Sequence, residues 1–155
     1  MKLTPTLDGG FRIDTEHDGD WVLLQSIIDD ADPEKLAHQL SESIASSEIS
    51  EDWRDFVLPD LIEGFNSDLA TVREALKRAN GGENPEPIHV PPKESMAWYS
   101  SLNQARLNLE ECFHFDLNVA SKHEDIARKM AFLRSRIYLE LQSLILDRAL
   151  NAPDS

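Results

Sequence analysis

The stretch that decides the fold is Ile137-Tyr-Leu-Glu-Leu-Gln-Ser-Leu-Ile-Leu146, near the end of a chain of 155 residues. Its apolar residues lie on nearly all sides of a helix, whereas a surface helix carries one apolar stripe. A helix of this kind lies at the centre of a bundle or in an interface between copies of the chain. We predict the whole helix over residues 121–150, with a buried face made of Ile126, Met130, Leu133, Ile137, Leu141, Leu144 and Ile145.

A second long helix is predicted just upstream, over residues 93–114. Its apolar face is expected to comprise Met96 or Trp98, Leu102, Ala105, Leu109, and Cys112 or Phe113. Cys112, the one cysteine of the chain, is therefore expected in the core, since a buried cysteine behaves as a small apolar residue.

Residues 15–80 are predicted to form acidic helices. The first ends near Asp30, and the second, over residues 33–45, has Pro33 at its first position. The third contains Pro59, and we expect a kink or a one-residue break near Leu58 because proline lacks the N–H that a helix interior needs. Its apolar pattern is Trp53, Phe56, Val57, Leu61, Ile62, Phe65, Leu69, Val72 and Leu76.

The N-terminal residues 1–14 are predicted to form a β-hairpin around the turn Asp8-Gly9-Gly10. Residues 81–92 form a proline-rich connector in which 88–90 is expected to add a short strand to the hairpin. The chain is thus predicted to be a single domain, residues 1–155, and mainly α: a bundle of four to five helices with a small N-terminal β-hairpin.

The charge of the chain is uneven. The formal net charge is −14, and residues 1–100 contain 8 basic against 21 acidic residues, which leaves −13 in that part. Such a surface repels nucleic acids and anionic lipids and favours a protein partner with a basic surface. No apolar run is long enough to cross a membrane, and one cysteine without an apolar leader at the start of the sequence predicts a cytoplasmic protein.

The motifs of catalysis and cofactor binding are missing from the sequence. Neither glycine pair follows a strand and opens a helix, as a nucleotide-binding loop requires, and no glycine-flanked serine elbow is present. The tightest group of metal-ligand types is Cys112, His114, His123 and Glu124, but the first two lie two residues apart on a helix and point in different directions. We therefore assign no catalytic residue, metal or cofactor.

Four polar residues interrupt the apolar faces of the last two helices: Asn103, Arg106, Tyr138 and Gln142. The members of each pair are three or four residues apart and lie side by side on one helix surface. If the two helices pack together, the four form a polar network that fixes their register, or they line a site for a small anionic ligand held by Arg106.

The same residues carry a resemblance to a known family. The blocks Trp98-Tyr-Ser-Ser-Leu-Asn-Gln-Ala-Arg-Leu-Asn-Leu109 and Tyr138-Leu-Glu-Leu-Gln142 resemble an uncharacterised bacterial family, best represented in actinobacteria and often encoded beside the Clp protease adaptor. The resemblance implies a helical fold and a genomic context, and it implies no reaction.

These observations favour a non-catalytic protein-interaction or regulatory module, with a homodimer through the C-terminal helix and a basic protein partner. The alternative is a small-molecule or anion sensor, or a small enzyme, with a pocket between the last two helices. A third hypothesis is an acidic decoy that imitates nucleic acid, which requires carboxylates in regular rows on one surface.

Overall fold

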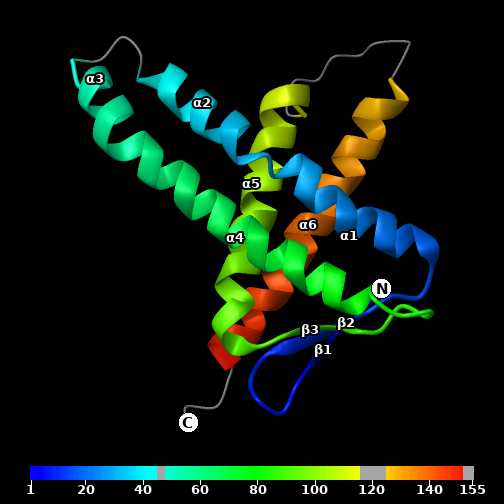
Figure 1. Ribbon diagram of the computed structural model, residues 1–155. Coiled ribbons are helices and arrows are strands. Elements are labelled where there is room, and N and C mark those ends of the chain that lie inside the picture. Colours follow the sequence, from blue (N-terminus) through cyan, green and yellow to red (C-terminus); the bar gives the residue numbers. More distant parts are fainter. Residues whose placement is uncertain (45–47, 116–124, 152–155) are drawn as a thin grey trace.

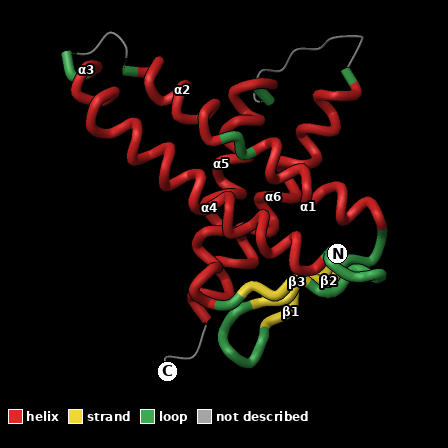
Figure 2. Tube along the Cα trace, viewed as in Figure 1, coloured by secondary structure: helices red, strands yellow, loops and turns green. Residues whose placement is uncertain are grey.

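A three-stranded antiparallel sheet closes one end of a helical bundle in the computed structural model, which describes residues 1–44, 48–115 and 125–151 (Figures 1 and 2). The elements are β1 (Lys2–Pro5), β2 (Phe11–Asp14), α1 (Asp18–Asp30), α2 (Pro33–Ser43), α3 (Ser50–Asp52), a π-helical turn (Trp53–Val57), α4 (Leu58–Ala79), β3 (Ile88–Val90), a 3₁₀ turn (Pro92–Glu94), α5 (Ser95–Phe113) and α6 (Ile126–Asn151). The predicted fold class, a helical bundle with an N-terminal hairpin, is confirmed.

The sheet has the order β1-β2-β3, so the predicted addition of residues 88–90 to the hairpin is confirmed. Its inner face places Phe11, Ile13, Ile88 and Val90 in the core. The tight turn depends on glycine: Gly9 has a φ of 90°, and a Cβ on Gly10 would lie 2.2 Å from the carbonyl oxygen of Val90.

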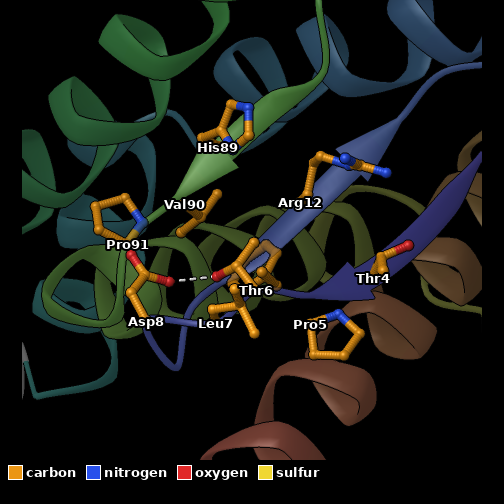
Figure 3. Close-up of a pocket in the computed structure, with 10 residues that line it drawn as sticks. Thr4, Pro5, Thr6, Leu7, Asp8, Arg12, His89, Val90 and Pro91 are labelled. Atoms are coloured by element: carbon orange, nitrogen blue, oxygen red, sulfur yellow. Dashed lines mark hydrogen bonds between the residues drawn. The ribbon is translucent and has the colours of Figure 1, made fainter.

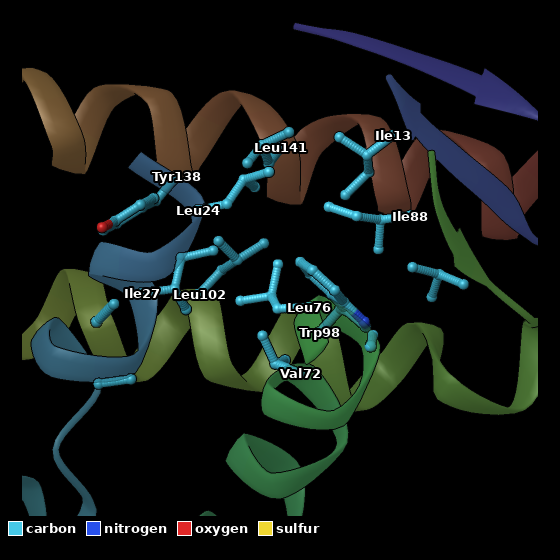
Figure 4. Close-up of a cluster of buried hydrophobic side chains, with 14 of the residues drawn as sticks. Ile13, Leu24, Ile27, Val72, Leu76, Ile88, Trp98, Leu102, Tyr138 and Leu141 are labelled. Carbon is cyan, nitrogen blue, oxygen red and sulfur yellow. The ribbon is translucent and has the colours of Figure 1, made fainter. Parts of the chain in front are cut away.

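Helix α5 lies at the centre of the bundle, where it contacts α1, α4 and α6. It runs antiparallel to α6, as Figure 1 shows, and Arg128 near the start of α6 donates to the carbonyl oxygens of Phe113 and His114 at the end of α5. The core between these helices and the sheet contains Trp98, whose ring meets that of Phe11 edge-on at a centroid distance of 6.4 Å (Figure 4). Among the described residues no helix is long and apolar enough to cross a bilayer.

The buried face of α6 differs from the predicted one. The buried residues of the helix are Ala131, Tyr138, Leu141, Gln142 and Ile145. Four residues of the predicted face are exposed instead: Ile126, Met130, Leu133 and Leu144. The helix is rotated about its axis because the polar residues on the buried side, Tyr138 and Gln142, have hydrogen-bond partners in α1 and α5.

Cys112 is a second correction, since it is exposed rather than part of the core. The buried apolar residues of α5 are Trp98, Leu102, Ala105 and Leu109, and Leu109 is the last buried residue before the half-buried Phe113 at the end of the helix. Cys112 lies on the same side of the helix as Ala105, seven residues before it, but it is in the last turn of α5, beyond the last buried position.

The region around Pro59 departs from an α-helix as expected, though by widening rather than by a break. Residues 53–57 form a π-helical turn in which the N–H of Leu58 donates to the carbonyl of Trp53, and α4 then begins with proline in its first turn. The wider turn accommodates a residue that cannot donate an N–H. The predicted apolar pattern is buried only from Leu69 onward, and Phe56 and Val57 are exposed.

Candidate functional site

A cluster of polar side chains joins the end of α1 to α6. The guanidinium of Arg134 donates to both oxygens of Asp30, from Nε at 2.8 Å and from Nη2 at 3.2 Å. The hydroxyl of Tyr138, a fully buried residue, donates to Oδ2 of Asp30 at 2.7 Å. The side chain of Asp30 is 11% exposed and that of Arg134 is 25% exposed, so solvent competes little for these charged hydrogen bonds.

The surroundings of this cluster keep its donors protonated. Burial, followed by the hydrogen bond to Asp30, raises the pKa of Tyr138 well above its ordinary value. The hydrogen bond to Asp30 raises the pKa of Arg134 as well. A neutral tyrosine and a charged arginine act here as hydrogen-bond donors, and proton transfer near neutral pH is not a role that these pKa values favour.

The second polar contact joins α5 to α6. Nη1 of Arg106 donates to Oε1 of Gln142 at 2.7 Å, and Nε2 of Gln142 lies 3.4 Å from the carbonyl oxygen of Tyr99. The structure therefore brings Arg106 and Gln142 together, and it places Tyr138 one turn before Gln142 on the same face of α6. Asn103 is exposed and stands apart from this contact. A ligand-binding role for the four residues stays a prediction.

Sequence reasoning missed three residues of this polar region: Asp30, Arg134 and Asn108. The amide nitrogen of Asn108 donates to the carbonyl oxygens of Asp30 and Asp32, at 3.0 and 3.1 Å, and so satisfies the end of α1. One signal was available in the sequence. A carboxylate in the last turn of a helix is disfavoured by the helix dipole, so Asp30 at that position indicates a partner elsewhere in the fold.

Helix α5 also buries a row of polar side chains on the face that includes Asn108. Ser101 and Gln104 precede it by seven and four residues, and all three are almost fully buried. Among the described residues, the hydroxyl of Ser101 and both amide atoms of Gln104 have no hydrogen-bond partner. Such groups destabilise a fold by about 1–3 kcal/mol when buried unpaired, which makes Gln104 an informative position for a stability test.

A cavity of about 450 Å³ lies at the hairpin, on the side of the sheet away from the core (Figure 3). Cross-strand neighbours Thr4, Arg12 and His89 line it from the three strands. Thr6 donates to Asp8 within the lining, and Arg12 donates at 3.1 Å to Asp14, which lies outside it. The hydroxyl of Thr6 and the N–H of Gly10 lower the pKa of Asp8, which therefore stays ionised. The cavity is open, and we assign no ligand to it.

The group of metal-ligand types around the end of α5 is incompletely described, since His123 and Glu124 lie outside the described residues. Within residues 1–44, 48–115 and 125–151, no three His, Cys, Asp or Glu side chains gather in a way that would hold a metal ion.

A family of known sequences matches most of the chain. A model of a domain of unknown function, DUF2017, matches residues 10–147, which covers everything from the last residue of the hairpin turn to the final part of α6. No curated protein and no solved structure matches the chain.

Proposed function

The chain belongs to the DUF2017 family of domains of unknown function, and we propose that it is a non-catalytic, single-domain interaction module that forms a homodimer and binds a basic protein partner in the cytoplasm. The expected distribution of the family in actinobacteria, beside the Clp protease adaptor, is part of this proposal.

The observation that carries the proposal is an exposed apolar seam on α6. We define the α6 seam as Ile126, Met130, Leu133, Ile137 and Leu144, of which Ile137 is half-buried against the core and the others are exposed. Exposure is 77% for Ile126, 50% for Met130, 51% for Leu133 and 40% for Leu144. The first four residues alternate spacings of four and three, which is the repeat of helices that pair along their length. A row of large exposed apolar side chains on one helix face marks an interaction surface.

The charges beside the α6 seam favour a second copy of this chain in antiparallel orientation. Lys129 and Arg136 flank the N-terminal half of the seam, and Glu140 and Asp147 follow on the same side of the helix. A two-fold axis beside residue 138 sets Arg136 opposite Glu140 and Lys129 opposite Asp147 of the second copy, because each pair is equally distant from residue 138. One register therefore brings both pairs of opposite charge together twice, as an isologous interface requires.

The test of this proposal is the mass of the protein in solution. Sedimentation velocity at about 10–100 µM protein should show a dimer for the native chain and a monomer for Leu133→Glu. The substitution opposes dimerisation because its carboxylate would lose its water in the interface. Leu139→Glu is the matched control, because Leu139 is 46% exposed on the same helix but lies about a third of a turn away from Leu133.

The orientation is tested by charge reversal. Arg136→Glu should weaken the dimer, and adding Glu140→Arg in the same chain should restore it, since the two positions face each other only across an antiparallel pair. A native chain that stays monomeric at 100 µM, or a dimer that Leu133→Glu leaves intact, would overturn the homodimer.

The second candidate function is an anion sensor with its site between α5 and α6, at Asn103, Arg106, Tyr138 and Gln142. The observation in its favour is Nε of Arg106, which is buried without a hydrogen-bond partner among the described residues. A shift of the unfolding temperature by phosphate, sulfate or a small carboxylate, lost in Arg106→Gln, supports this candidate. Equal shifts in both proteins count against it.

A further inference from the structure

Residues 48–63 form an acidic arm, comprising α3, the π-helical turn and the first residues of α4, which lies beside α2 at the end of the molecule opposite the sheet (Figure 1). The buried core cluster contains no residue from this range, and its first residue in α4 is Leu69. A side-chain contact holds the arm to α2, where Nε1 of Trp53 donates to the hydroxyl oxygen of Ser41 at 3.3 Å. The arm is thus exposed on most of its surface.

The acidic arm carries large apolar side chains that the fold leaves uncovered. Phe56 is 72% exposed and Val57 is 39% exposed, and both belong to the π-helical turn. A π-helical turn is less favourable than an α-helical one and is frequent at functional positions. Beside it, between α2 and the start of α4, a cavity of about 310 Å³ is lined by His38, Ser41, Glu42, Arg54 and Leu58.

The charge around these apolar side chains is strongly negative. Six exposed carboxylates stand against a single basic residue, Arg54, which gives residues 48–63 a net charge of −5: Glu48, Glu51, Asp52, Asp55, Asp60 and Glu63. This charge disfavours a second acidic arm, a nucleic acid and an anionic membrane as the occupant. The same charge is complementary to that of a basic occupant.

We infer that the acidic arm is the docking surface for a basic amphipathic helix of a partner protein, whose apolar face covers Phe56 and Val57 and whose basic side chains meet the surrounding carboxylates. The apolar contact supplies the stability of the complex and the carboxylates supply its rate of formation and its selectivity. The inference rests on the proposed function, because it names the surface and the partner chemistry of that interaction module.

The experiment measures binding of a synthetic 18-residue peptide of leucine and lysine, with its leucines on one helical face, by titration calorimetry. A scrambled peptide of the same composition, which lacks the apolar face, is the second probe. The native chain should bind the amphipathic peptide at least tenfold more tightly than the scrambled one, and raising the salt concentration should weaken both.

Two matched variants locate the contact. Phe56→Ser should weaken binding of the amphipathic peptide at least tenfold, as expected for an aromatic anchor of an interface. Val22→Ser should change it less than twofold, since Val22 is 65% exposed on α1, outside the arm. Circular dichroism checks that both variants fold, which the exposure of the two side chains favours.

The inference would be overturned if Phe56→Ser and Val22→Ser had equal effects, or if the amphipathic and the scrambled peptide bound with equal affinity. Either result would show that the peptides are attracted by charge without a defined site. The measurements are repeated in Leu133→Glu, whose substitution lies in the α6 seam. If Leu133→Glu still binds the peptide, the acidic arm is supported whether or not the homodimer forms. If the native chain forms a dimer but does not bind the peptide, the docking surface is refuted and the homodimer is not.

Discussion

The replacement Tyr138→Phe isolates one bond of the cluster that joins α1 to α6. The ring of Tyr138 is fully buried, and the replacement removes its hydroxyl, which donates to Asp30 at 2.7 Å. Both hydrogen bonds from Arg134 to Asp30 stay in place. A hydrogen bond to a charged group contributes about 1.5–3 kcal/mol, and water cannot replace it at this depth. We expect the free energy of unfolding to fall by about 2 kcal/mol.

The assay is urea denaturation followed by circular dichroism, with thermal unfolding beside it. For a domain of this size, 2 kcal/mol corresponds to a decrease of about 4–8 °C in the unfolding temperature. Tyr99→Phe is the control, because the hydroxyl of Tyr99 makes no hydrogen bond within the described part of the chain. Equal stabilities of the two variants would refute the reasoning. A double-mutant cycle with Asp30→Asn should give a coupling energy of about 1–2 kcal/mol.

The difference in stability between the native chain and Tyr138→Phe depends on pH. The folded state raises the pKa of Tyr138, whereas the unfolded chain ionises this group at about pH 10. The stability that the raised pKa represents is therefore complete below pH 10 and is lost as the pH rises further, by about 1.4 kcal/mol per pH unit. The advantage of the native chain over Tyr138→Phe should shrink above pH 10. An advantage that stays constant to pH 11 would contradict the assignment.

Three further substitutions or reactions test separate features. Gln104→Met should raise the free energy of unfolding by about 1 kcal/mol, because it removes two unpaired buried polar atoms, and urea denaturation measures the change. Gly10→Ala should lower it by about 2–3 kcal/mol, since the new Cβ meets the carbonyl of Val90, and unchanged stability would show that the turn adapts. The thiol of Cys112 should react with a disulfide reagent in the folded protein as fast as in urea; protection in the folded state would place it in the core after all.

The elements of this fold are readable in the sequence because their causes are local. The positions of the hairpin, of α1 and of α2 follow from glycine, proline and apolar spacing within a few residues, and the structure begins and ends these elements within about two residues of the predicted bounds. The short strand at residues 88–90 is also indicated by its local sequence, whereas its pairing with β2 joins segments that are distant in the chain. The uneven charge, which motivates a basic partner, is likewise a property of the sequence alone.

The faces of the helices were decided by the tertiary structure. The rotation of α6, which buries Tyr138 and exposes Leu133, depends on Asp30, a residue 108 positions before Tyr138 in the chain. Periodicity identifies a helix with too many apolar residues for one face, but it does not choose between its faces, because that choice depends on partners distant in sequence. The exposure of Asn103 has the same origin. The sequence by itself therefore determined the helices and the acidic charge, and the tertiary contacts decided that an apolar seam stays open on α6.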